Sequence, residues 1–249
     1  MPQLRLCLVL GGAALAATAC GDSAGGSTDI QPTLRLADRS DLELQRLINA
    51  AAGTDMFVAQ AQVDRFGDTF DPDPCPQLAI SGATVTATGG CTRLDGTRVD
   101  GRATIDNPLG WDQLEYVYGK DSHYQLEQLT FTPEGGGDPQ VFDGFLDRTD
   151  SMTTWDADLT VTSSGLAVRS DLYFHCTDPA NPVCELTNSG LELPGVGGVT
   201  ATGRVTLDRS TNRQTMDFAL HGQDTLTIHS DGTCVAWHIV GTSRGTSCP

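Results

Sequence analysis

From Gln77 to the end of the chain, apolar and polar residues alternate along short segments, which is the period of a half-buried β-strand. The segments are rich in Thr and Val and are separated by turns that contain Gly. They include ATVTAT, GTRVDGRATI, QLEQLTFT, ADLTVTSSGLAV, VTATGRVTLDR, QTMDFALH and DTLTIHSDGTCVAWHIV. The turn candidates are Asp95-Gly96, Ser164-Gly165, Asp208 to Asn212 and Asp231-Gly232. The pattern predicts a mainly β chain, an antiparallel meander closed as a sandwich or barrel.

A short helix is predicted ahead of these strands. Ser40 and Glu43 have the spacing of a capping box, and Gly53 supplies a stop. The segment 55–66 stays open, because its apolar residues alternate as in a strand while its alanines also suit a helix. The apolar residues that recur on one face of the first helix are Leu44, Leu47, Ile48 and Ala51.

The last hairpin can be placed residue by residue. If Asp231-Gly232 form a two-residue loop, His229 lies opposite Cys234. His229 and His238 then share the polar face but lie about 13 Å apart, at ~3.3 Å per residue. That separation is too large for both to hold one metal ion, and two exposed histidines are expected. The residues that share the core face are Leu226, Ile228, Val235 and Trp237.

One string, VTATG, occurs at 85–89 and again at 199–203. It is consistent with two related β halves that meet near 150–165, although any Thr-rich strand uses these residues and convergence is the simpler explanation. We therefore expect residues 39–249 to form one β-domain, with two halves as the alternative.

The first 19 residues have the pattern of an export signal. Arg5 precedes an apolar stretch, 6–17, that ends in small residues. The stretch spans about a dozen residues, whereas a membrane-spanning helix needs roughly 20. No later segment of the sequence approaches that apolar length.

The residues Ala17-Thr18-Ala19-Cys20 resemble the lipobox of bacterial lipoproteins. The resemblance covers this signal only. It implies that Cys20 becomes the first residue of the mature chain, carries a diacylglyceryl group and is acylated at its amino group. Two or more acyl chains give stable anchoring, at ~0.8 kcal/mol per buried methylene. The implied location is the cell envelope, with the outer membrane expected. The alternative is an ordinary secretory signal that leaves Cys20 as a thiol.

The other cysteines support this interpretation. Of the 8 cysteines, Cys7 lies in the signal and Cys20 is assigned to lipid. The even remainder in an exported chain predicts disulfides, for which 15 pairings of six cysteines are open. We expect neighbours to pair, namely Cys75 with Cys91, Cys176 with Cys184, and Cys234 with Cys248.

Residues 20–38 begin with the small, polar string GDSAGGST, which is typical of a flexible linker. They predict a tether between the membrane and the β-domain. If it runs to about Ala37, random-coil scaling gives a reach of about 20–25 Å.

The chain is strongly acidic. Its 15 Lys and Arg against 32 Asp and Glu give a formal charge of −17, and loss of Arg5 with the signal makes it 14 − 32 = −18. Lys120 is the single lysine. Such a surface disfavours nucleic acid and anionic lipid headgroups as partners, so the acyl group is left as the membrane anchor.

The sequence offers no catalytic constellation and no cofactor fingerprint. The string at 241–245, GTSRG, matches the G-x-S-x-G pattern of serine hydrolases but has no acid or histidine after it, so a chance match is expected. His175 beside Cys176 lacks the spacing of common zinc sites. Two acidic groups supply oxygens without the spacing of a calcium loop, and solvated loops are expected: Asp68, Asp71 and Asp73, and Asp147, Asp150, Asp156 and Asp158.

These observations predict a lipid-anchored envelope protein that acts by binding or by structural support, and not an enzyme. The alternative is a carrier of a lipid or another apolar ligand, because half-barrels can enclose such a cavity. A third class is an enzyme whose site is assembled from distant strands.

Overall fold

The computed structural model describes residues 28–67, 73–106, 121–149, 154–177, 183–208, 213–231, 234–239 and 242–247. Four helical segments come first: η1 (Leu36–Asp38), α1 (Asp41–Ala51), α2 (Thr54–Asp64) and η2 (Arg65–Gly67). The strands are β1 (Gln77–Ser81), β2 (Thr84–Thr88), β3 (Cys91–Thr92), β4 (Arg98–Asp106), β5 (Ser122–Thr132), β6 (Gln140–Thr149), β7 (Thr154–Ser163), β8 (Leu166–Thr177), β9 (Val183–Leu193), β10 (Gly197–Asp208), β11 (Arg213–His221), β12 (Thr225–Ser230), β13 (Val235–Ile239) and β14 (Thr242–Ser247).

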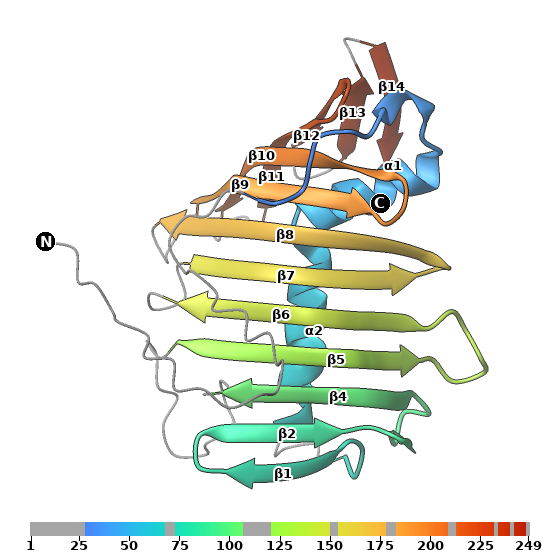
Figure 1. The fold of residues 1–249 in the computed structure, drawn as a ribbon, viewed down its shortest axis with the longest axis vertical. Coiled ribbons are helices and arrows are strands. Elements are labelled where there is room, and N and C mark those ends of the chain that lie inside the picture. The colour runs from blue at the N-terminus through green and yellow to red at the C-terminus, as the bar shows by residue number, and fades with distance from the viewer. Residues whose placement is uncertain are drawn as a thin grey trace, which may run out of the picture.

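The strands form one antiparallel meander in the order β1-β2-β4-β5-β6-β7-β8-β9-β10-β11-β12-β13-β14, with the short β3 paired to β4. The prediction of a mainly β, antiparallel fold is confirmed. The predicted closure is wrong, because the sheet curves like part of a barrel but leaves β1 and β14 as its two ends (Figure 1). The sheet is also continuous across 150–165, where β6, β7 and β8 pair with one another.

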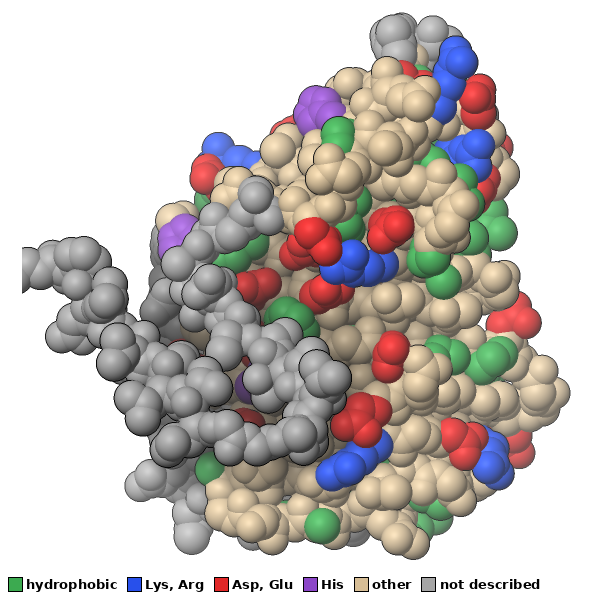
Figure 2. Space-filling model, in the orientation of Figure 1, with side chains coloured by type: hydrophobic (Ala, Val, Ile, Leu, Met, Phe, Trp, Pro, Cys, Tyr) green, Lys and Arg blue, Asp and Glu red, His purple; other side chains and the backbone are tan. Residues whose placement is uncertain are grey.

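Both α-helices lie on the same side of the sheet, behind the strands in Figure 1. The space between them is filled by buried side chains that include Leu47 of α1, Met56 of α2 and Leu159 of β7. Full burial of one such side chain contributes about 1.5–3 kcal/mol. The opposite face of the sheet carries mainly polar and acidic side chains (Figure 2). None of the helices in the described part of the chain is long and apolar enough to cross a membrane.

The predicted first helix is confirmed, with its capping box. The Glu43 N–H donates to Ser40 Oγ (3.3 Å) and the Ser40 N–H donates to Glu43 Oε2 (2.7 Å). That backbone hydrogen bond lowers the pKa of the Glu43 carboxyl below its usual value.

The segment that the sequence left open is helical. It starts after Gly53, whose positive φ of 70° and close contact with the Phe174 ring suit no other residue. Ala59 and Val63 are buried, one turn apart, whereas Phe57 is 43% exposed. The burial therefore follows a helical period, and the strand-like alternation had no role in this segment.

The predicted tether is shorter than the sequence suggested. Ile30, Leu34 and Leu36 are buried, so the chain from Thr28 to Asp38 packs against the domain and is not a linker. The Leu34 N–H donates to the Gly198 carbonyl (2.9 Å). The Asp224 carboxylate accepts the N–H groups of Leu36 (2.6 Å) and Ala37 (2.9 Å). The spacing of these apolar residues, four and then two positions apart, was the sequence signal that the segment packs against the domain. The small, polar composition of the preceding residues concealed it.

The register of the last hairpin differs from the predicted one by two residues. Ser230 pairs with Val235 and His229 with Ala236, because four residues and not two connect β12 to β13. Asp231 Oδ1 accepts the Cys234 N–H (3.1 Å) inside this connection. An even shift keeps each side chain on its predicted face. It brings His229 and His238 to positions two residues apart in register, about 7 Å along the strands at ~3.3 Å per residue.

Two predicted disulfides are confirmed, Cys75–Cys91 and Cys176–Cys184. Cys234 is also disulfide-bonded, and its predicted partner, Cys248, lies outside the described residues.

The predicted Ser164-Gly165 turn is confirmed as a two-residue connection between β7 and β8, with φ of 53° and 72°. Most of the predicted turn from Asp208 to Asn212 lies outside the described residues.

We predict that Asp224→Ala frees the N-terminal segment. The variant leaves two backbone N–H groups without their carboxylate, so we expect a loss of about 1–3 kcal/mol in unfolding free energy. Hydrogen exchange measured by mass spectrometry is expected to accelerate over residues 34–38. Asp217→Ala, which removes an exposed carboxylate, is the control and is expected to change neither quantity. Unchanged exchange at 34–38 in Asp224→Ala would contradict the assigned clamp.

Candidate functional site

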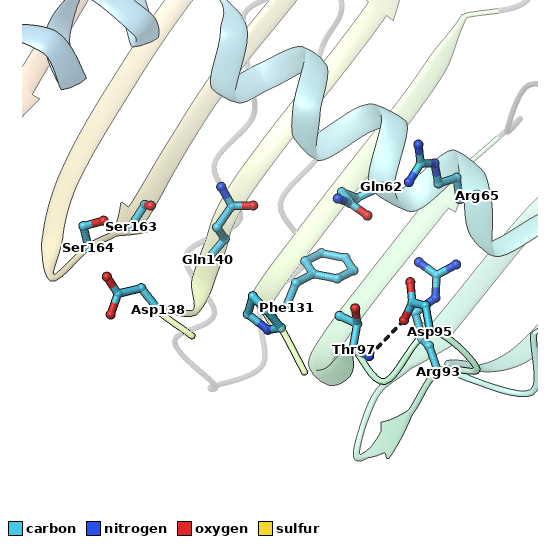
Figure 3. Close-up of a pocket in the computed structure, with 11 residues that line it drawn as sticks. Gln62, Arg65, Arg93, Asp95, Thr97, Phe131, Asp138, Gln140, Ser163 and Ser164 are labelled. Carbon is cyan, nitrogen blue, oxygen red and sulfur yellow. Dashed lines mark hydrogen bonds between the residues drawn. The ribbon is translucent and has the colours of Figure 1, made fainter. Parts of the chain in front are cut away.

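A pocket of 360 Å³ lies where the end of α2 meets the hairpin connections along one edge of the sheet (Figure 3). Its volume is near the lower end of the range for small-molecule sites, about 300–1,000 Å³. The side chains come from five separate segments of the chain. They are Gln62, Arg65, Arg93, Asp95, Thr97, Phe131, Pro133, Asp138, Gln140, Ser163 and Ser164.

One wall is the β3–β4 connection, which Asp73 holds from outside the pocket. Asp73 Oδ2 accepts the Leu94 N–H (2.9 Å) and Arg93 Nε–H (3.3 Å), and Oδ1 accepts the Cys75 N–H (3.0 Å). Burial acts to raise the pKa of Asp73, but these hydrogen bonds and the Arg93 charge lower it below its usual value. The Cys75–Cys91 disulfide ties the same segment to the start of β3. The wall is therefore fixed before any ligand binds.

Within this wall, Asp95 Oδ1 accepts the Thr97 N–H (2.9 Å), as the dashed line in Figure 3 shows. That backbone hydrogen bond lowers the pKa of Asp95, so the group is an anion at neutral pH. The following Gly96 has a φ of 83° and packs against the Glu134 side chain, where a Cβ would come within 2.7 Å. The contact holds the β3–β4 connection against the β5–β6 connection.

The floor of the pocket is Phe131, whose ring is fixed on two sides. It is stacked with Phe66 and meets Phe142 edge to face, each at a centroid distance of 6.0 Å. Such ring pairs add about 0.5–1.5 kcal/mol beyond their burial. Pro133 extends this apolar surface at the end of β5. The floor is thus rigid and apolar, whereas nearly all other lining groups are polar.

The roof comes from the end of α2, where Gln62 points toward Phe131 in Figure 3. Arg65 follows in η2 and is exposed, without an ion-pair partner among the described residues. Two arginines, two aspartates, two glutamines and three hydroxyls therefore surround the floor. Arg93 is already paired with Asp73, so Arg65 shares the lining with the two carboxylates of Asp95 and Asp138, and the lining supplies both hydrogen-bond donors and acceptors.

The face of the sheet opposite the helices carries a second unusual set of side chains. Asp147 on β6 pairs directly with Asp156 on β7, and Asp158 on β7 pairs directly with Asp171 on β8. Like charges at such positions destabilise a sheet. Among the described residues, no three His, Cys, Asp or Glu side chains are placed to hold one metal ion.

These carboxylates differ in whether a positively charged side chain is paired with them. Arg169 donates two hydrogen bonds to Asp158, from Nε (2.9 Å) and Nη2 (2.8 Å), and this pairing raises the arginine pKa. Burial, together with the charges of Asp147, Asp171 and Asp158, raises the pKa of Asp156 to about 6. Asp156 is therefore a carboxyl group on this face that changes its charge near neutral pH.

His123 on β5 neighbours the same row and contacts Asp147 through Nδ1. This hydrogen bond raises the pKa of the imidazole above its usual value. Both side chains are partly exposed, at 45% and 33%. A histidine and a carboxylate therefore meet on this face, but the pocket described above does not include them.

The structure assigns several sequence candidates to other roles. Asp73 holds a loop, while Asp68, Asp71 and Asp150 lie outside the described residues. The GTSRG serine, Ser243, lies within strand β14 and not in a strand–turn–helix. His175 contacts Thr154 Oγ1 (3.3 Å), and Cys176 beside it is in a disulfide. Cys20 lies outside the described residues.

The residues that line the pocket were not recognised from the sequence as one site. The lining spans about a hundred positions of chain, and each member is an ordinary turn or helix residue in its own segment. The local signals were Asp95-Gly96 and Ser164-Gly165, both of which were predicted as turns only. By contrast, Asp147, Asp156 and Asp158 were grouped in the sequence and do lie together, but Asp171 was not expected among them.

We predict that Asp156→Asn stabilises the protein at neutral pH. The folded-state pKa of Asp156 lies above its usual value of 3.8. The contribution of Asp156 to folding stability is therefore complete below about pH 4, where the carboxyl is protonated in both the folded and the unfolded state. It is lost as pH rises through about 6, where the folded protein has to bury the charged form. With allowance for solvent screening, we expect a gain of about 1 kcal/mol at pH 7 and none at pH 4, measured by urea unfolding. Asp158→Asn is the matched control and is expected to destabilise, because Arg169 loses the carboxylate that accepts two of its hydrogen bonds. Equal effects of Asp156→Asn at both pH values would contradict the prediction.

In the comparisons with known proteins, no protein-family model, curated protein or solved structure matches this chain. The described residues form a pocket with a fixed wall and floor on one side of the sheet and an acidic face on the other.

Proposed function

We propose that this chain is a lipid-anchored protein of the cell envelope that binds a small polyhydroxylated ligand, such as a saccharide unit, in the pocket beside α2. The observation that carries the proposal is the lining of that pocket, an apolar floor surrounded by charges of both signs, amides and hydroxyls.

A saccharide fits this lining for physical reasons. Its hydroxyl groups both donate and accept hydrogen bonds, which suits neighbouring carboxylate, guanidinium, amide and hydroxyl groups. Its C–H faces suit the Phe131 ring and Pro133 at the floor. A highly anionic ligand suits the pocket less, because Arg93 is already paired with Asp73 and Arg65 shares the lining with Asp95 and Asp138. The net charge of −17 also repels polyanions.

The same lining disfavours the alternative of an apolar-ligand carrier. Such a ligand would leave the charged and amide groups around the opening without hydrogen-bond partners, at about 1–3 kcal/mol for each buried group. In the described residues, the space between the helices and the sheet is occupied by the side chains of one continuous core. An enzymatic role is the weaker proposal, since His123 and Asp147 lie outside the pocket.

The anchor is the second part of the proposal and depends on the lipobox resemblance at Cys20. Eight peptide units separate Cys20 from Thr28, where the chain begins to pack on the sheet. Their contour allows at most about 28 Å between these two residues, at ~3.5 Å per residue. A lipid on Cys20 therefore keeps the domain within about one domain radius of the membrane surface.

The binding proposal is tested with a glycan array followed by titration of the best glycan by isothermal titration calorimetry. We expect wild-type binding in the micromolar to millimolar range and at least tenfold weaker binding for Arg65→Ala and Gln140→Ala, which remove polar lining groups. Arg204→Ala, on the exposed side of β10, is the control and is expected to bind as wild type. Absence of glycan binding, or equal binding by all variants, overturns the proposal.

The anchoring proposal is tested by mass spectrometry of the mature amino terminus in wild type and Cys20→Ser. We expect a lipid-modified Cys20 and membrane fractionation for wild type, and loss of both in the variant. An unmodified terminus that starts at another residue would reject the lipoprotein assignment and leave the pocket proposal untouched.

A further inference from the structure

Among the residues that the structure describes, one charged side chain lies in the interior without an ion pair. Arg148, near the end of β6, is 1% exposed and points to the helical side of the sheet. Its Nη2 donates to Ser122 Oγ on β5 (2.8 Å). Its Nε and Nη1 are buried and have no hydrogen-bond partner in the described part of the chain.

A second unpaired donor lies beside it. Trp155 on β7 is paired directly opposite Arg148, so both side chains project from the same face, with Cβ atoms about 5 Å apart. The indole Nε1–H of Trp155 is also buried without an acceptor. Phe57 of α2 meets the indole edge to face at 6.0 Å and covers it. Two adjacent residues thus present three buried donor nitrogens without an acceptor, Nε and Nη1 of Arg148 and Nε1 of Trp155.

The nearest carboxylate does not neutralise this arginine directly. Asp64 at the end of α2 accepts a hydrogen bond from the Tyr124 hydroxyl (3.0 Å) and forms no ion pair with Arg148. Burial raises the pKa of Asp64 above its usual value, and the Arg148 charge opposes that shift only in part. Asp64 therefore shares the neighbourhood of Arg148 without supplying an acceptor to it.

This arrangement is costly unless an acceptor completes it. Buried charges in proteins are paired or bound to a ligand, and each unsatisfied buried N–H costs about 1–3 kcal/mol. Arg46, the other buried arginine, differs because Asp55 is its ion-pair partner at 3.3 Å, although Arg46 Nε also has no hydrogen-bond partner. A group that satisfies Arg148 would have to accept hydrogen bonds and carry negative charge.

We propose that Arg148 and Trp155 form a binding site for a carboxylate group. A single negative charge balances the guanidinium, and two oxygens can accept from both the guanidinium and the indole. A doubly charged phosphate suits the site less, because it would lie near Asp64 in a dry interior. None of the residues that line the pocket beside α2 belongs to this site, so the inference does not depend on the proposed saccharide binding.

Acetate is the probe for this site. Tryptophan fluorescence and the thermal midpoint are measured on the full-length protein while acetate replaces chloride at constant ionic strength. We expect a saturable fluorescence change and a rise of several degrees in the midpoint for wild type. Arg148→Met is expected to abolish both responses. Arg204→Gln, on the exposed side of β10 and outside both proposed sites, is the control and is expected to respond as wild type.

Because Arg148→Met removes a core residue and could fail to fold, Trp155→Phe provides a second test. It keeps the ring and deletes one N–H donor, so we expect weaker acetate binding, by about three- to tenfold, in line broadening of ¹³C-acetate. The proposal is overturned if wild type shows no acetate response, if chloride acts equally, or if the Trp155→Phe variant binds acetate as wild type does.

Discussion

The contact on which this structure depends is the packing of α1 and α2 across one face of a single, open sheet. A meander of this length buries only one of its faces, because its strands pair with their neighbours and no second sheet covers them. The helices supply the missing layer, with Leu47 and Met56 seated against the central strands. The N-terminal segment is held by the Asp224 carboxylate just before α1 and fixes where this layer begins.

The two faces of the sheet differ because only one of them has this cover. On the helical side, α2 crosses the strands, so its end and the hairpin connections enclose a pocket over Phe131, and the interior retains Arg148 as an unpaired charge. On the open side, water is available, and directly opposed carboxylates such as Asp147 and Asp156 are tolerated. Asp156 changes its charge near pH 6 because partial burial, and then the charges of Asp147, Asp171 and Asp158, raise its pKa.

The elements that sequence predicted well are those set by local chemistry. The Ser40 capping box, the Ser164-Gly165 turn and the strands from Gln77 onward depend on residues a few positions apart. The disulfides Cys75–Cys91 and Cys176–Cys184 also close short loops and were predicted. The β12–β13 register failed by two residues, because the number of residues in a connection is decided by the pairing of both strands and not by its most turn-like dipeptide.

The sequence by itself determined the class of the fold, the face that each strand residue occupies and the candidate anchor at Cys20, because alternation, capping and small-residue signals are local. Only the tertiary structure decided that the sheet stays open, that residues 28–38 pack as part of the domain, and that Arg65, Phe131 and Ser164 surround one pocket. The physical reason is that these outcomes depend on contacts between segments far apart in the chain. Such contacts are selected by shape, burial and charge compensation, which no short window of sequence contains.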